Sequence, residues 1–480
     1  MKMVENRNNI ILATDSYKIG HWQQYPKNTE GVYSYFESRP GAEFPYTVFF
    51  GLQDILKKFL VGQRIKQFDI TNAAVLAGSH FGSRHIFGYD RWQHIVDDHQ
   101  GFLPLRIKAV PEGTVVPTGN VLMTVENTCP KCYWLTNAVE SLLTHVWYPS
   151  TVATLSRHTK EMIARYLEST ADNMDGLPFM LHDFGYRGAS SHETAAIGGA
   201  GHLVNFLGTD TLPAMILAMD SYGADDQTLA FSVPATEHSV MTSLGRDGEL
   251  DIVDQLLEEY PEGILSCVAD SYNIYDFVNN ICDHYKDELL ARDGKFVIRP
   301  DSVTDLHPYP STLVAWILER LWGAFGGEIN SKGMKVLDPH VGVIWGDGID
   351  PHGIENILST AQIHGFSAEN LVFGMGGGLL QKVNRDTQRF AFKSSAQKRD
   401  GEWHDVYKQP LDSSKASKKG RLMLTKDTLG NYETLPLGDF HDHVATDDLL
   451  QVVFEDGKLY NEQTFDEIRE RAALTQAVTV

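Results

Sequence analysis

The sequence lacks several features that would assign it to a specialised class of protein. Its 480 residues include only four cysteines and 19 prolines, which argues against a disulfide scaffold, a collagen-like chain and extensive disorder. No apolar run approaches the roughly 20 residues of a membrane span, and the N-terminal segment lacks the apolar core of a signal peptide. We therefore expect a globular, cytoplasmic protein.

Basic charge is also scarce. The chain has 41 Lys and Arg against 63 Asp and Glu, which gives a formal net charge of -22. Such a chain repels nucleic acids and anionic membranes unless its basic residues gather locally. We therefore expect neither a nucleic acid nor a membrane as a partner.

Two of the cysteines form a single CPKC motif at residues 129–132. The other two, Cys267 and Cys282, are far apart, so no second cysteine pair completes a zinc site. A turn between two elements is the favoured interpretation, with a redox or metal motif as the alternative.

The two ends of the chain show a mixture of helical and strand patterns. Apolar residues recur at helical spacing over 48–60, 133–148 and 152–169, and alternate with period two from residue 103 towards 127. Strand-like segments follow residue 420, and 465–474 is helix-like. We expect the C-terminal segment to return to the N-terminal region.

The central part repeats a short apolar run, a polar loop and a helix-like segment. The runs are FML before His182, LVNFL before Gly208, LAFSV before Pro234, ILSCVA before Asp270, FVI before Arg299, VGVIW before Gly346 and LVF before Gly374. Buried parallel strands have this pattern. The predicted fold is α/β: an irregular β/α barrel over 179–388, with a second mixed α+β domain formed by 1–178 and 389–480.

Polar and glycine residues follow each of these runs, where the loops of a β/α barrel converge on one face. They are His182, Asp183, Phe184, Arg187, Asp210, Ser232, His238, Asp270, Arg299, Asp301, Gly346, Asp347, Gly376, Gly377 and Gly378. Any one of them alone is as well explained by a helix cap or a loop hydrogen bond. Seven strand ends together predict an active site.

Three features predict a multiply phosphorylated substrate. The string FGMGGGLLQK puts glycines between a strand and a helix, where backbone N–H groups can approach an anion. Arg187, Arg299 and Arg385 lie near strand ends or this loop, and a basic segment covers 392–421. Asp270 and Asp301 could hold Mg²⁺ through water when it arrives with a polyphosphate.

Ten strings spread in order over residues 12–422 resemble the nicotinamide phosphoribosyltransferase family. They are LATDSYK, YSYFESR, LHDFGYRG, NFLGTDT, SVPATEHS, ADSYNIY, IRPDS, WGDGID, FGMGGGLLQK and KKGRL. The resemblance implies transfer of phosphoribosyl from phosphoribosyl pyrophosphate to nicotinamide, with Mg²⁺ and optional coupling to ATP. It also implies a homodimer with active sites at the subunit interface.

The resemblance assigns roles to individual residues. Phe184 and Tyr17 of the partner subunit would sandwich the nicotinamide ring, Asp210 would accept a hydrogen bond from the amide, and Ser232 would be a further substrate-binding residue. His238 would be phosphorylated by ATP, with Asp270 and Glu237 orienting its ring. The ribose and its phosphate would be held by Arg187, Arg299, Asp301, Gly346, Asp347, Gly376 and Gly377, and the pyrophosphate by Arg39, Arg385, Lys393 and Lys415.

Three other functions fit the sequence less well. A nicotinate phosphoribosyltransferase is disfavoured because Asp210 would repel the carboxylate of its substrate. A catalytically silent binding protein would not need the charged residues above, and a glycosidase would leave the basic segment unexplained. Val303, Thr236 and Ala391 depart from the family pattern, which bears on affinity and ATP coupling.

Overall fold

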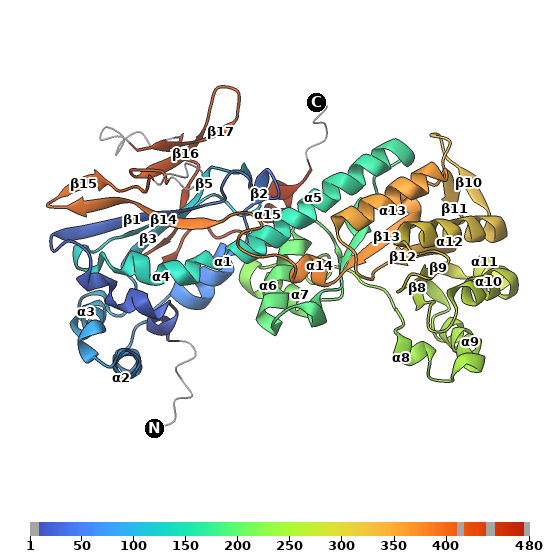
Figure 1. The fold of residues 1–480 in the computed structure, drawn as a ribbon, viewed down its shortest axis with the longest axis horizontal. Helices are drawn as coiled ribbons and strands as arrows, with labels where there is room; N and C mark the ends of the chain where they lie inside the picture. Colours follow the sequence, from blue (N-terminus) through green and yellow to red (C-terminus); the bar gives the residue numbers. More distant parts are fainter. Residues whose placement is uncertain (1–8, 410–416, 438–446, 475–480) are drawn as a thin grey trace. The chain divides into compact units, whose positions relative to one another are not determined.

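The computed structural model describes residues 9–409, 417–437 and 447–474 (Figure 1). Within them the chain forms two compact units. The first contains residues 9–154, 217–224 and 384–473, and the second contains 155–216 and 225–383. The predicted domain boundaries after residues 178 and 388 stay a prediction. None of the described helices is both long enough and apolar enough to span a bilayer.

The first unit is built on an antiparallel sheet with the strand order β15-β14-β1-β5-β3-β18-β19. Its strands are β1 (Thr29–Glu37), β3 (Leu105–Ala109), β5 (Val121–Asn127), β14 (Ala391–Arg399), β15 (Glu402–Asp405), β18 (Gln451–Glu455) and β19 (Lys458–Leu459). Strand β14 pairs with β1, and β18 pairs with β3. The C-terminal segment therefore does return to the N-terminal region, and the basic segment begins as a sheet strand.

Helices and two short hairpins complete this unit. In Figure 1, α4 lies below the sheet, where it packs on β1, β5 and β14, and the β16–β17 hairpin lies above it. The elements are β2 (Tyr46–Val48), α1 (Leu52–Ile55), α2 (Gln67–Phe81), α3 (Tyr89–His99), β4 (Val115–Pro117), α4 (Leu135–Thr144), β16 (Leu422–Lys426), β17 (Tyr432–Pro436) and α15 (Phe465–Ala472). The 24-residue α5 (Trp147–Thr170) contains residues of both units.

The helix predicted over 48–60 is shorter than expected. Val48 ends β2, and the helical segment begins at Leu52 as α1 and continues as one π-helical stretch, Leu56–Leu60. Gly51 separates the two with a φ of 99°, a left-handed conformation that favours glycine. Helical spacing alone does not reveal where such a turn interrupts the chain.

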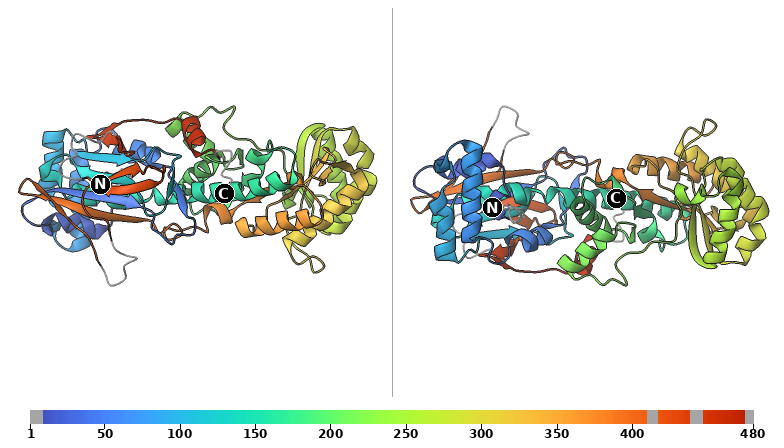
Figure 2. Two further views of the ribbon diagram at one scale, coloured as in Figure 1. Left: turned by 90° about the horizontal axis from the view of Figure 1, so that it is seen from above. Right: turned by 90° about the horizontal axis from the view of Figure 1, so that it is seen from below.

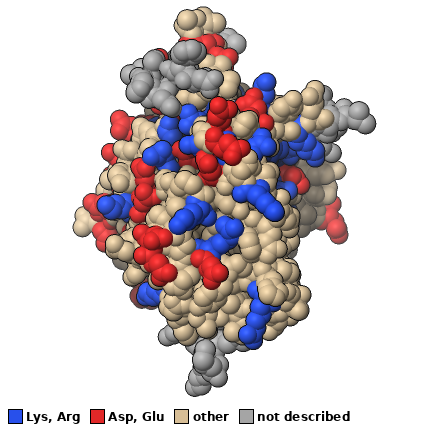
Figure 3. All heavy atoms as spheres, turned by 90° about the vertical axis from the view of Figure 1, so that its left-hand side faces the viewer, with Lys and Arg blue, Asp and Glu red and all other residues tan. Residues whose placement is uncertain are grey.

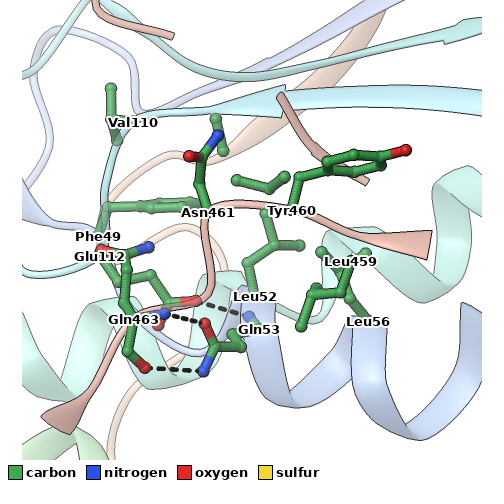
Figure 4. A pocket seen from close by; sticks show the side chains of 12 residues that line it. Phe49, Leu52, Gln53, Leu56, Val110, Glu112, Leu459, Tyr460, Asn461 and Gln463 are labelled. Carbon is green, nitrogen blue, oxygen red and sulfur yellow. Dashed lines mark hydrogen bonds between the residues drawn. The ribbon is translucent and has the colours of Figure 1, made fainter. Parts of the chain in front are cut away.

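A small pocket in the first unit contains a buried carboxylate (Figure 4). Glu112 accepts hydrogen bonds from the backbone N–H groups of Gly51 (2.7 Å) and Gln53 (2.6 Å) and from the Tyr222 hydroxyl (3.0 Å). Burial raises the pKa of Glu112 to about 7. The pocket has room for about one water molecule, so it is a structural feature and not a substrate site.

The second unit contains a six-stranded sheet with the order β7-β6-β13-β12-β9-β8. Its strands are β6 (Leu181–Asp183), β7 (Gly208–Thr209), β8 (Glu262–Val268), β9 (Asp293–Arg299), β12 (Val341–Trp345) and β13 (Leu371–Met375). All neighbouring strands are parallel. The α/β class predicted from the apolar runs is confirmed, and the carboxyl ends of the strands share one edge.

Helices cover these strands. In Figure 2 the helices of residues 250–325, coloured yellow-green to gold, lie against the strands of this sheet. The elements are α6 (His192–Leu203), α7 (Leu212–Tyr222), α8 (His238–Met241), α9 (Glu249–Glu259), α10 (Ile274–His284), α11 (Lys286–Ala291), α12 (Pro310–Phe325), β10 (Gly327–Ile329), β11 (Lys335–Leu337), α13 (Pro351–Ile363) and α14 (Gly377–Leu380). The last part of α7, from residue 217, belongs to the first unit.

Two of the apolar runs are not strands, contrary to prediction. The run at 203–207 begins as the last residue of α6, and β7 starts only at Gly208. The run at 229–233 forms a single parallel bridge, between Phe231 and Gly208. A short apolar run marks a buried segment, but it does not distinguish a strand from a buried helix end.

Candidate functional site

The predicted site residues of the second unit follow the carboxyl ends of its parallel strands. Phe184 follows β6, Asp210 follows β7, Asp270 follows β8, Asp301 follows β9 and Asp347 follows β12. Because these ends lie along one edge of the sheet, side chains from positions far apart in sequence come together there.

Phe184 lies across the backbone of two neighbouring strands. Its N–H donates to the carbonyl of Met375 at 3.0 Å. A Cβ atom added to Gly374 would come within 2.0 Å of the Phe184 ring, and one added to Gly346 within 3.1 Å. The two glycines therefore make room for the ring. The ring is half-buried, so a flat ligand can reach it.

Asp210 lies at the next strand end along the sheet edge. Its N–H donates to the carbonyl of Asp183 at 2.9 Å, the residue before Phe184. The Ser232 hydroxyl donates to Asp210 Oδ1 at 2.6 Å. Burial lowers the pKa of His182, and the charge of Asp210 partly opposes this shift. An exposed carboxylate and a hydroxyl thus lie at the strand end next to that of Phe184.

His238 lies beside two carboxylates from different strand ends. Its Nε2 is 3.7 Å from Asp270 Oδ1 and 3.5 Å from Asp301 Oδ2, and its Nδ1 is 3.3 Å from the Ser271 hydroxyl. The imidazole is 46% exposed, whereas the Asp270 side chain is 7% exposed. The ring is therefore held from its buried side and accessible to a ligand from solvent.

Glu237 does not take the position beside the imidazole that the sequence suggested. It is the N-cap residue of α8, and its carboxylate accepts a hydrogen bond from Ser239. Sequence reasoning placed Asp301 at the ribose and did not foresee it at the His238 ring. Ser271 was missed as well, although it directly follows Asp270 in the same loop.

Several of the remaining charged residues at the strand ends are partly buried, and some of their polar atoms have no hydrogen-bond partner among the described residues. Arg299 Nη2 is 3.8 Å from Asp301 Oδ1, and Ser302 donates a hydrogen bond to Asp270 Oδ2. Arg299 Nε and Asp270 Oδ1 are buried without a hydrogen-bond partner among the described residues. Burial raises the pKa of Asp347, and the charges of Asp301 and Asp270 raise it further. A cationic side chain and a carboxylate of this cluster thus each keep one buried atom without a hydrogen-bond partner among the described residues.

The glycine loop follows β13. Gly376 precedes the short helix α14, and no atom lies within 4 Å of a Cβ added to Gly377, so this backbone is open. At Gly378, by contrast, an added Cβ would lie 2.6 Å from the carbonyl of Ile349. Arg187 is exposed in the 3-10 turn Tyr186–Gly188 that follows Phe184.

The other predicted site residues belong to the first unit. Tyr17 is 60% exposed. Arg39 Nε donates to the carbonyl of Arg389 at 3.1 Å, and Arg385 is exposed. Lys415 lies outside the described residues.

Lys393 lies in β14 opposite Tyr35 of β1. Burial lowers the pKa of its ammonium group; the cations Arg39, Lys418 and Lys408 also lower it, while Glu37 opposes them. Lys418 forms an ion pair with Glu37 at 2.6 Å. This cluster has several cations around one carboxylate, a composition that favours an anionic ligand. On the face shown in Figure 3, basic and acidic side chains are interspersed, with no broad field of one sign.

Two family models match the chain. That of the nicotinate phosphoribosyltransferase family matches residues 179–458, and that of the N-terminal domain of nicotinamide phosphoribosyltransferase matches residues 9–107.

Curated relatives extend over nearly the whole sequence. A nicotinamide phosphoribosyltransferase of Xanthomonas campestris pv. campestris is 46% identical over 474 residues, covering 97% of this chain and 98% of the relative. One of Acinetobacter baylyi is 34% identical and covers 97% of both chains. One of Mycoplasma pneumoniae is 35% identical, covering 86% of this chain and 94% of the relative.

Solved structures share the fold at low sequence identity. A nicotinate-nucleotide pyrophosphorylase from Pyrococcus furiosus has a TM-score of 0.59 at 15% identity and covers 98% of this chain and 97% of its own. The human nicotinic acid phosphoribosyltransferase has a TM-score of 0.55 at 14% identity, and the match covers 96% of this chain and 92% of the human chain. On the family models and the curated relatives together, the chain belongs to the nicotinate phosphoribosyltransferase family.

Proposed function

We propose that this chain transfers the phosphoribosyl group of phosphoribosyl pyrophosphate to nicotinamide, giving nicotinamide mononucleotide and pyrophosphate. The reaction salvages nicotinamide for NAD synthesis. The relatives named for this activity cover nearly the whole chain, with identity up to 46%. The structural observation that carries the proposal is the hydrogen bond between Ser232 and Asp210, at the strand end next to that of Phe184.

This pair fits an amide better than an acid. The Ser232 hydroxyl occupies Oδ1 of Asp210, so Oδ2 is left to accept a hydrogen bond from the amide NH₂ of nicotinamide. The carboxylate of nicotinate would instead face the negative charge of Asp210. The same pocket therefore disfavours a nicotinate phosphoribosyltransferase.

The transfer itself needs alignment and charge stabilisation and no protein nucleophile. The pyridine nitrogen forms a bond to C1 of the ribose as the bond from C1 to the pyrophosphate oxygen breaks, and the leaving pyrophosphate takes the electron pair. Asp301 would support the ribose hydroxyls and the developing positive centre, and Arg299 and Arg187 would hold the 5′-phosphate. The backbone of Gly376 and the open backbone of Gly377 would bind the same phosphate. The loop of Gly346 and Asp347 would contact the ribose.

The carboxylate cluster fits a divalent cation. Asp270 Oδ1 is buried without a hydrogen-bond partner among the described residues, and the neighbouring charges raise the pKa of Asp347. Bound Mg²⁺ would neutralise charge that develops on the pyrophosphate. Among the described residues of this cluster, no three donor atoms lie close enough to bind one ion directly, which favours contact through water from Asp270 or Asp301.

We further propose that ATP phosphorylates His238. An unprotonated ring nitrogen would attack the γ-phosphorus as the bond to ADP breaks, and Asp270 and Asp301 would hold the ring in place. The exposure of the imidazole and the two carboxylates within 3.7 Å support this role. The phosphohistidine would add negative charge beside the pyrophosphate and so alter the affinity for substrate and product.

Basic residues of the first unit would bind the pyrophosphate. Arg39, Arg385, Lys393 and Lys415 are the proposed contacts. Burial is the largest cause of the lowered pKa of Lys393, and the repulsion from its cationic neighbours, which an incoming anion would relieve, lowers the pKa further.

We propose a homodimer with shared sites, in which Tyr17 of the partner subunit covers the ring bound at Phe184. The 60% exposure of Tyr17 supports a contact outside its own chain. Mixing Tyr17→Ala with Arg299→Ala protein under subunit exchange should restore part of the activity, because one of the two sites in each heterodimer is intact. No recovery in verified heterodimers would contradict a shared site.

The parallel sheet of the second unit would close into an irregular barrel. Residues 231–235 support this, because Phe231 bridges to Gly208 at one end of the sheet and Ala235 bridges to Ser266 at the other. The cytoplasmic location stays a prediction.

The activity is tested with purified protein, phosphoribosyl pyrophosphate, Mg²⁺ and nicotinamide. We expect equal amounts of nicotinamide mononucleotide and pyrophosphate, and a loss of at least ~100-fold in kcat/KM for Phe184→Ala or Arg299→Ala, because each removes an orienting contact. Absence of product with correctly folded wild-type protein would refute the proposal.

A further inference from the structure

The first unit contains a second group of side chains with metal-binding atoms. His94 and His99 come from α3 (Figure 1), and Cys129 and Cys132 come from the segment after β5. One donor atom of each residue lies within 4.8 Å of the donor atoms of the other three. We propose that these four residues bind one zinc ion.

The distances agree with a tetrahedral site. Zinc binds sulfur at ~2.3 Å and imidazole nitrogen at ~2.0 Å, so neighbouring donor atoms around it are separated by roughly 3.3–3.8 Å. His94 Nε2 is 3.4 Å from Cys129 Sγ, within that interval. The remaining separations, at most 4.8 Å, need to shorten by about 1 Å, which side-chain rotation supplies.

The second shell of the site is also present. Nδ1 of His94 is paired with the carboxylate of Asp98 one helical turn later, while Nε2 faces Cys129. When the imidazole is neutral, donation of its Nδ1–H to a carboxylate leaves the lone pair of Nε2 for a metal. This carboxylate–histidine arrangement is an observation independent of the clustering of the four donors.

Hydrogen bonds fix the cysteine loop in the conformation that brings both thiols together. Pro130–Cys132 forms a 3-10 turn in which the N–H of Cys132 donates to the carbonyl of Cys129 at 2.9 Å. The Asn127 side chain donates to the same carbonyl at 2.8 Å. Both thiols are free, so no disulfide competes with metal binding.

The composition of the cluster favours a metal. Cys132 is fully buried and Cys129 is partly exposed, and both lie against two histidines. Two thiolates with two imidazoles are a ligand set that suits zinc. Four protein ligands leave no open coordination position, so the ion would be structural, connecting the end of α3 to the loop before α4. A surface pocket lined in part by His94, Pro130 and Lys131 provides an entry path.

The sequence contains part of the pattern that is usual for a zinc site. The cysteine pair has the usual CxxC spacing, and His94 and His99 are separated by four residues, also a usual spacing in zinc sites. The two histidines, however, precede the cysteines in the sequence. They are overlooked when only a second cysteine pair is expected to complete the site.

Metal analysis of the full-length protein expressed with zinc tests the proposal. We expect about one zinc per chain in the wild type and in the control His85→Ala, which changes an exposed histidine of the neighbouring turn Arg84–Ile86. Cys129→Ser and His99→Ala should lose most of the metal. X-ray absorption should show two sulfur and two nitrogen ligands at ~2.3 and ~2.0 Å. Zinc-free wild type, or unchanged zinc in both variants, would overturn the proposal.

A second variant tests the site even if the ligand variants do not fold. Asp98→Asn keeps all four ligands, and loss of the outer-shell carboxylate should weaken zinc affinity by ~10–100-fold in competition with a chromophoric chelator. Wild-type affinity in this variant would contradict the assigned second shell. Transferase activity is not a readout here, so the zinc site and the proposed function can fail separately.

Discussion

Replacing Asp210 by asparagine should reduce the preference for nicotinamide over nicotinate. The substitution removes one negative charge at nearly constant shape and retains the oxygen that accepts the Ser232 hydroxyl at 2.6 Å. A nicotinate carboxylate at ~4 Å from Asp210 would be repelled by ~4 kcal/mol at an effective dielectric constant of ~20 and by ~1 kcal/mol in bulk water.

Asp210 is exposed in this chain, and a bound ring would cover it partly, so the repulsion lies between these limits. Since each ~1.4 kcal/mol is a factor of ten, the ratio of kcat/KM for the two bases should fall by at least ~5-fold and at most by ~1000-fold.

The assay measures kcat/KM for each base separately, at saturating phosphoribosyl pyrophosphate and Mg²⁺, with the products separated by chromatography. Asp226→Asn is the matched control, because it removes the same charge from an exposed position in a different loop. An unchanged ratio in folded Asp210→Asn protein would mean that selectivity does not depend on this carboxylate.

Three further predictions concern ATP coupling, the aromatic platform and stability. His238→Ala should lose ATPase activity and ATP stimulation while basal synthesis remains, and persistent stimulation would exclude its role. Gly374→Ala should displace the Phe184 ring, because the nearest ring atom lies 2.0 Å from the added Cβ. The KM for nicotinamide should then rise ~10-fold. The control Gly323→Ala has open space around the added Cβ and should leave this KM unchanged. Glu112 has a pKa of about 7 in the folded chain against 4.5 ordinarily, so its proton stabilises the fold fully below about pH 4.5, and this contribution is lost as the pH rises to about 7. Urea titrations at several pH values should show this loss in the wild type but not in a Glu112→Gln variant.

The sequence located the loops of the second unit because parallel strands leave a clear pattern. A buried strand is a continuous apolar run, and the first polar residues after it lie at the sheet edge. Asp270 and Asp347 could be placed in this way. The runs at 203–207 and 229–233 were misjudged because burial, and not strand geometry, produces the apolar pattern.

The direction in which a side chain points could not be predicted from its neighbours in the sequence. Glu237 is next to His238 in sequence, but the start of α8 directs its carboxylate to Ser239, and Asp301 from another strand end lies at 3.5 Å from the imidazole instead. The histidine ligands of the zinc site were missed for the same reason. They become neighbours of CPKC only when α3 is folded beside the segment after β5.

The most direct test of the proposed activity is a competition in one tube. Equimolar nicotinamide and nicotinate are supplied with limiting phosphoribosyl pyrophosphate, Mg²⁺ and purified protein, and both mononucleotides are quantified from the start of the reaction. The account predicts that nicotinamide mononucleotide forms in large excess, with an equal amount of pyrophosphate. Nicotinate mononucleotide as the main product would contradict it.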